Sequence, residues 1–163
     1  MPLPILPVPA RPVDDAIIDT PWGQWAHDTA LGVPGGCIAV AQLTAGFAFS
    51  TSPIDIPGLA VTFTAAAGRR FKVTAEMYVQ TTVTGDRIGF VIANAGGASL
   101  ASAVFVATAN NGEMITRSLI TTPAAGPVTY KLRGYRAAGT GSVSMVATAS
   151  DPAFIIVEDV GPV

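Results

Sequence analysis

Apolar and polar residues alternate strictly between residues 71 and 80. The apolar positions are Phe71, Val73, Ala75, Met77 and Val79, and the polar positions between them are Lys72, Thr74, Glu76, Tyr78 and Gln80. Successive side chains of a β-strand point to opposite faces of its sheet, so this period predicts a strand with one face in the core. Turn-forming residues bound the segment on both sides, at Gly68-Arg69-Arg70 and at Thr84-Gly85-Asp86.

Short segments of the same kind, separated by glycine and proline turns, fill the chain from about residue 36 onward. We predict strands over Cys37–Leu43, Leu59–Ala65, Arg87–Ala93, Ala101–Thr108, Glu113–Thr121, Val128–Tyr135, Ser142–Thr148 and Phe154–Val160. Asn111-Gly112 is a favoured sequence for a two-residue hairpin, and Gly139-Thr140-Gly141 also indicates a hairpin turn. Many short strands without alternating helices predict an antiparallel jelly-roll sandwich.

The last predicted strand breaks the alternation. Phe154-Ile155-Ile156-Val157 is a continuous apolar run, so both of its faces need to be covered. In a two-sheet sandwich one face meets the core. The other needs a further partner, and a copy of the same chain around a symmetry axis is the simplest one.

The beginning of the chain has a different composition. Residues 1–20 include Pro2, Pro4, Pro7, Pro9 and Pro12, which predict an extended, polyproline-like anchoring arm. In residues 21–35 we predict a short helix and a linker, and in residues 36–163 the jelly-roll trimerisation domain. We expect the arm and the helix to dock on another protein; a loosely ordered terminus is the alternative reading of the arm. The predicted docking residues are Pro4, Ile5, Leu6, Val8, Trp22 and Trp25.

Composition points to assembly and argues against two classes of partner. Of the 163 residues, 50% are hydrophobic and only 12% are charged, against about 25% charged in typical domains. Either the chain is a monomer whose surface consists mostly of uncharged residues, or part of its surface is covered by other chains. The net charge of -2 leaves no basic surplus for nucleic acid. Glycine, proline and asparagine interrupt the charge-free stretches 29–54 and 88–112, so we expect no membrane insertion.

The residue types that carry chemistry are scarce. His27 is the one imidazole, and we expect it on a helix surface; Cys37 is the one thiol, and we expect it to be a small buried residue. The carboxylate pairs Asp14-Asp15 and Glu158-Asp159 are adjacent in sequence, which does not place them across a cleft as glycan hydrolysis requires. We therefore expect no catalytic site, no metal and no cofactor.

Several segments resemble one class of known protein. These are Trp22-Gly23 with Asp28, the stretch 62–74, Thr129-Tyr130-Lys131-Leu132-Arg133 followed by Gly139-Thr140-Gly141, and the terminal stretch 152–162. Together they resemble minor virion structural proteins of tailed phages that infect actinobacteria. The resemblance implies a minor tail protein, head fibre or capsid decoration protein, with a homotrimeric jelly roll similar to the C1q and tumour necrosis factor (TNF) module. It brings no catalytic residue with it.

The leading hypothesis is thus a non-enzymatic virion protein, made in the host cytoplasm without a signal peptide, whose partners are itself and other proteins of the capsid or tail. The predicted trimer interface consists of Tyr78, Tyr130, Phe154, Ile155, Ile156 and Val157. The alternative is a host-receptor or carbohydrate-binding module displayed on the virion, with a host-surface glycan as partner. In that reading the side chains that stack on a sugar come from Tyr78, Tyr130, Tyr135, Trp22 and Trp25.

Overall fold

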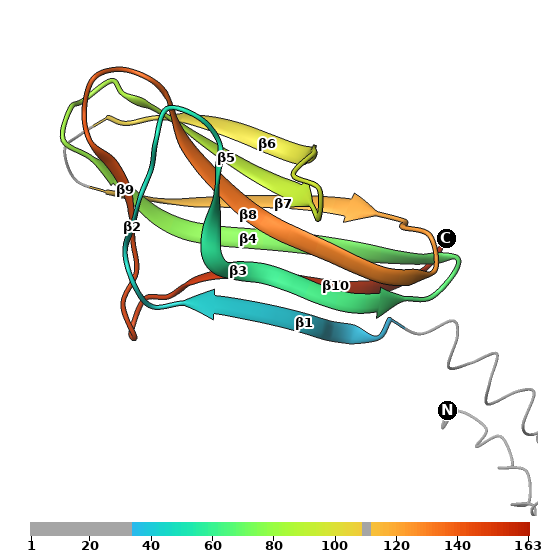
Figure 1. Ribbon diagram of the computed structural model, residues 1–163. Coiled ribbons are helices and arrows are strands. Elements are labelled where there is room, and N and C mark those ends of the chain that lie inside the picture. Colours follow the sequence, from blue (N-terminus) through green and yellow to red (C-terminus); the bar gives the residue numbers. More distant parts are fainter. Residues whose placement is uncertain (1–33, 109–111) are drawn as a thin grey trace, which may run out of the picture.

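The computed structural model describes residues 34–108 and 112–163, and all regular secondary structure in these ranges is β (Figure 1). The strands are β1 (Gly36–Leu43), β2 (Phe47–Ala48), β3 (Ile54–Ala65), β4 (Arg69–Thr81), β5 (Arg87–Asn94), β6 (Ser99–Val106), β7 (Glu113–Thr121), β8 (Gly126–Ala138), β9 (Val143–Val146) and β10 (Ala153–Pro162). The expected all-β class is confirmed.

The strands form two antiparallel sheets that pack face to face. In the first sheet β10 lies between β1 and β4, β7 pairs with β4, and β9 joins β4 to β2. The second sheet has the order β3-β8-β5-β6. The start of β1 and the C-terminus lie at the same end of the sandwich (Figure 1), where Gly36 is opposite Asp159. The predicted antiparallel jelly-roll sandwich is confirmed.

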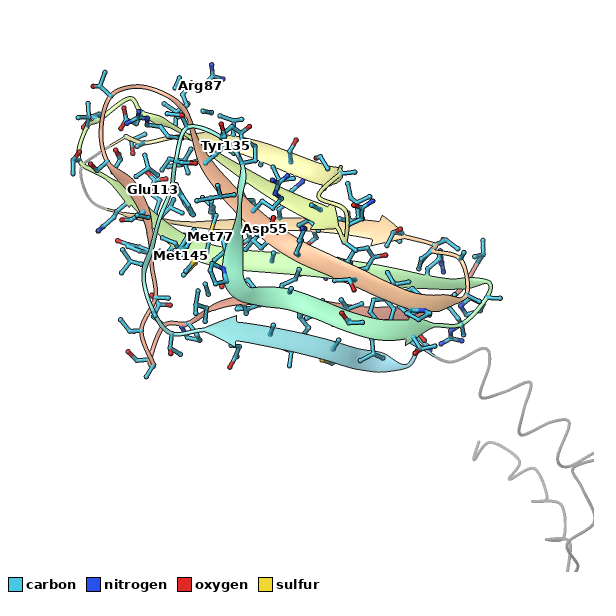
Figure 2. The ribbon with its side chains drawn as sticks, in the orientation of Figure 1. Asp55, Met77, Arg87, Glu113, Tyr135 and Met145 are labelled. Carbon is cyan, nitrogen blue, oxygen red and sulfur yellow. The ribbon has the colours of Figure 1, made fainter. Side chains whose placement is uncertain are left out.

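The core is built from the inward-facing half of each alternating strand. The apolar positions predicted in β4, from Phe71 to Val79, are all buried, while the polar positions between them are half-buried or exposed. Ile88, Phe90 and Ile92 face them from the second sheet. Figure 2 shows Met77 and Met145 between the two sheets. Because each of these side chains leaves water on folding, their burial is the main stabilising contribution to the fold.

Two predicted hairpins are wrong. β6 pairs with β5 and β7 pairs with β4, so the strands on either side of Asn111-Gly112 belong to different sheets and do not form a hairpin; Asn111 itself lies outside the described residues. Gly139-Thr140-Gly141 likewise connects β8 of the second sheet to β9 of the first. The preference of Asn-Gly for hairpins concerns the geometry of the local turn. Which strands pair with each other depends on which inner face their apolar residues cover.

The predicted arm, helix and docking residues lie outside the described residues, so Pro4, Ile5, Leu6, Val8, Trp22 and Trp25 stay predictions. His27 lies outside them as well. In the part of the chain that the structure describes, no helix has the length and hydropathy needed to cross a bilayer.

Candidate assembly surface on the outer face of the first sheet

The outer face of the first sheet carries the half-buried positions of β4 and β10 together with exposed residues of β1 and β7. We call this the outer face below. In β4, every second residue from Phe71 points into the core, so the residues between them point outward. In β10 the same alternation buries Ile155 and Val157 and turns their neighbours outward. The strand register then shows which outward side chains lie side by side.

One row of the outer face combines apolar and hydroxyl side chains. Ile156 of β10 lies opposite Val40 of β1 on one side and Thr74 of β4 on the other. Thr74 in turn lies opposite Ser118 of β7, and the two hydroxyls hydrogen-bond at 2.9 Å. Val40 is 55% exposed although it is flanked by β10. The two hydroxyls are hydrogen-bonded to each other. Burial of the aliphatic side chains in this row would therefore give the largest gain in free energy.

The next row repeats this arrangement. Phe154 of β10 lies between Gln42 of β1 and Glu76 of β4, and Glu76 lies opposite Thr116 of β7. The Thr116 hydroxyl donates to Glu76 Oε2 at 2.7 Å. The one carboxylate in the middle of the outer face is therefore already hydrogen-bonded within the chain.

Tyr78 occupies the third row. It lies between Val146 of β9 and Met114 of β7, and Met114 is 46% exposed. A Cβ placed on Gly112 would lie 2.1 Å from Cε1 of Tyr78, so the ring covers a site that only a glycine leaves open. The aromatic ring thus rests on the main chain, where it continues the apolar surface of Phe154 toward β7.

At the other end of the outer face, charges of opposite sign face each other. Lys72 Nζ lies 3.7 Å from Glu158 Oε2, and both side chains are exposed. Ile120 of β7, which is 65% exposed, lies opposite Lys72. The outer face is consequently apolar and hydroxyl-rich in its middle, with an exposed ion pair at its end that contributes little stability by itself.

The structure brings together part of the interface predicted from the sequence. Tyr78, Phe154 and Ile156 lie on the outer face, in neighbouring rows. Ile155 and Val157 are 0% exposed and face the core, so they cannot contact a second copy. This part of the prediction needs correction, because in an apolar run each residue still faces only one side of the sheet.

Tyr130 also needs correction. It is 3% exposed and lies in the core, with its ring centroid 5.8 Å from that of Phe63. Burial raises the pKa of its phenol above the ordinary value of 10.0. Its neighbours in β8 alternate with it, so Lys131 and Arg133 point outward in its place.

The remaining sequence candidates have these positions. Cys37 is exposed on β1, so the expectation that it is buried is wrong. Glu158 and Asp159 do not form a pair: Glu158 contacts Lys72 and Asp159 contacts Arg69. Within the described ranges, no three His, Cys, Asp or Glu side chains gather as metal ligands would.

Sequence reasoning missed the contributions of Val40, Met114 and Ile120 to the outer face. Each belongs to a segment that was correctly predicted as a strand. No sequence signal separates the two faces of an edge strand when both carry apolar residues, because only the register with the neighbouring strand decides which residues point outward.

No protein-family model and no curated protein sequence matches the chain. Among solved structures it is similar to the Eiger TNF of S. frugiperda, with a TM-score of 0.52 and 11% sequence identity over 78% of this chain and 95% of that one. A structure of the Gx strain of infectious bursal disease virus reaches a TM-score of 0.47 at 13% identity, over 95% of this chain and 37% of that one, which is too distant to add to the fold assignment. At these identities the similarity concerns the fold alone: the chain has a TNF-like jelly-roll fold.

Proposed function

We propose that this chain is a non-enzymatic structural protein of a virion, and that it forms a homotrimer through the outer face of its first sheet. The observation that carries the self-assembly part is the composition of that face: Val40, Phe154 and Ile156 lie side by side, next to Tyr78. Interfaces between permanently associated subunits are apolar at their centre and depleted of charge.

Burial of the outer face explains the unusual composition of the chain. A domain with 12% charged residues has few charges with which to cover a free surface. Fully burying one large aliphatic or aromatic side chain contributes about 1.5–3 kcal/mol of favourable free energy. Burial of several half-exposed side chains in one interface therefore offsets the entropy that the subunits lose on association. A symmetric assembly uses the same residues in every copy, so one apolar face suffices.

The virion assignment is supported by the sequence resemblance to phage virion proteins in the stretches 62–74 and 152–162. The two stretches meet in the first sheet, where β10 pairs with β4. In this proposal the arm, residues 1–20, and the helix and linker, residues 21–35, attach the trimer to the tail or the capsid.

Light scattering on the purified full chain tests the self-assembly. We expect three times the chain mass of 16.6 kDa at micromolar concentration. The variant Ile156→Arg places a charge in the centre of the outer face and should shift the mass to that of a monomer while the chain stays folded. The matched control is Thr64→Arg, which adds the same charge to an exposed position of β3 in the second sheet and should remain trimeric. A stable wild-type monomer would reject the proposal.

Attachment to the particle is tested separately. Removing residues 1–20 should leave a trimer that is no longer incorporated into virions during assembly. Unchanged incorporation would assign attachment to another part of the chain and reject the role proposed for the arm.

A further inference from the structure

Tyr135 lies flat on the main chain of Gly89, on the outer face of the second sheet. The two residues are opposite each other in neighbouring strands, β8 and β5. A Cβ placed on Gly89 would lie 2.0 Å from Cε1 of the ring, 2.2 Å from Cζ and 2.6 Å from Cδ1. An edge-on ring would bring one atom close and leave its neighbours much farther away. Three adjacent atoms at similar distances mean that the ring covers Gly89 with its face.

This arrangement leaves the opposite face of the ring available. Gly89 is buried beneath the ring, while Tyr135 itself stays partly exposed. Since one face of the ring rests on Gly89, a ligand that stacks on Tyr135 has to use the opposite face. An aromatic ring held parallel to a sheet by a glycine is a rigid platform, and little conformational entropy is lost when a flat apolar surface stacks on it.

Cationic side chains lie along the same face on both sides of the platform. Arg87 lies two residues before Gly89 in β5 and is exposed. In Figure 2, Arg87 and Tyr135 lie toward the same end of the second sheet. Among the described residues no carboxylate pairs with its guanidinium. On the other side, Arg133 precedes Tyr135 by two residues in β8.

The cations outnumber the acids on this face. Asp55 is the carboxylate that pairs there, with Lys131 Nζ at 2.7 Å and with Arg133 Nε at 2.8 Å. One acid thus faces two cations, and Arg87 adds a third, although the whole chain has a net charge of -2. The local excess of positive charge favours an anionic ligand.

We infer that this platform binds a saccharide that carries a carboxylate. The apolar C–H face of a pyranose ring stacks on the open face of Tyr135, and the guanidinium of Arg87 pairs with the carboxylate in the planar, two-bond geometry that arginine favours. The inference goes beyond the assembly role and does not depend on it, because the platform and the self-assembly surface lie on opposite sides of the sandwich.

Single-stranded nucleic acid also stacks on tyrosine and pairs with arginine, but its binding sites use several aromatic rings along a basic groove. Tyr135 is the one aromatic side chain that the described residues place on this face. The saccharide is therefore the better match.

A saccharide array probed with the intact full chain tests this. Sialylated and uronic-acid-containing oligosaccharides are compared with their neutral counterparts, and the best acidic ligand is then titrated calorimetrically. We expect binding to acidic members, weakened by added salt. Tyr135→Ala should lower the affinity by about tenfold or more, and Tyr135→Phe, which keeps the ring, should stay close to wild type. Arg87→Gln should remove the preference for the acidic over the neutral sugar.

The control Arg70→Gln removes an exposed arginine from β4 of the first sheet and should bind like the wild type. Melting temperatures confirm that every variant is folded. The inference is overturned if no acidic saccharide binds, if Tyr135→Ala binds like the wild type, or if a single-stranded oligonucleotide binds more tightly in a Tyr135-dependent way. The mass of each sample, measured in parallel, separates the two proposals: lost sugar binding in a trimer contradicts only this one, and a monomer that binds sugar contradicts only the assembly.

Discussion

Arg69 donates two hydrogen bonds to the same carboxylate oxygen of Asp159, from Nε at 3.0 Å and from Nη2 at 2.7 Å. The other carboxylate oxygen accepts from the backbone N–H of Gly161 at 2.9 Å. Burial alone would raise the pKa of Asp159, but the hydrogen bonds from Arg69 and from the backbone of Gly161 and Gly35 outweigh it and hold the pKa below the ordinary 3.8. One carboxylate thereby ties the start of β4 to the end of β10 and to the residue that precedes β1.

Breaking this contact should destabilise the fold. Arg69→Met leaves a largely buried carboxylate without its main partner, and we expect the free energy of unfolding to fall by about 1–3 kcal/mol. Urea denaturation followed by circular dichroism measures the change. The double variant Arg69→Met/Asp159→Leu should recover part of the loss, since no uncompensated charge is left. An unchanged urea midpoint in the single variant would contradict this account.

Asp86 should make the fold sensitive to acid. Its buried carboxylate accepts hydrogen bonds from the Thr81 hydroxyl and from the backbone N–H groups of Thr140 and Gly141, and these hold its pKa below 3.8. A lowered pKa contributes stability that is present above the ordinary value and lost as the pH falls through the folded-state value.

The variant Asp86→Asn is the test of that contribution. At pH 7 it should melt at a lower temperature than the wild type, because an amide cannot accept all the hydrogen bonds of a carboxylate. As the pH falls below about 4, the difference should shrink. The control Asp151→Asn changes an exposed aspartate in the connection before β10 and should follow the wild type. A constant difference between Asp86→Asn and the wild type down to pH 3 would argue against the pKa shift.

Gly89→Ala should be destabilising for a purely steric reason. The added methyl group would overlap the Tyr135 ring at 2.0 Å from Cε1, and overpacking of this kind costs about 1–3 kcal/mol. In the double variant Gly89→Ala/Tyr135→Ala the overlap is gone, so most of the stability should return. A thermal denaturation series over the four proteins measures the coupling, and additive losses would show that ring and glycine do not interact.

Two methionines should respond differently to truncation. Met77 is 0% exposed between the sheets, and Met77→Ala should lower the free energy of unfolding by about 2–5 kcal/mol through lost burial and a cavity. Met114 lies on the outer face, so Met114→Ala should leave the monomer fold intact and weaken self-association instead. Chemical denaturation together with light scattering distinguishes the two effects; equal losses of fold stability would contradict the assignment of Met114 to the outer face.

The strand pattern could be predicted because it depends on local alternation. Glu113–Thr121 was predicted with the bounds that β7 has, and the strand expected over 71–80 forms the middle of β4. The two-residue strand β2, Phe47–Ala48, was missed because a segment this short has no period to detect. The outer face was predicted only in part: the apolar run at Phe154 indicates that both faces are covered, but not which side chain points where.

The fold class and most of the strands can be predicted from local patterns, since alternation and turn residues act between neighbours along the chain. Three features are visible only in the folded chain: β6 and β7 belong to different sheets, Tyr130 is in the core, and Tyr135 rests on Gly89. These facts arise from contacts between segments far apart in sequence. Their geometry is set by register and by packing between the sheets, and no local pattern encodes either.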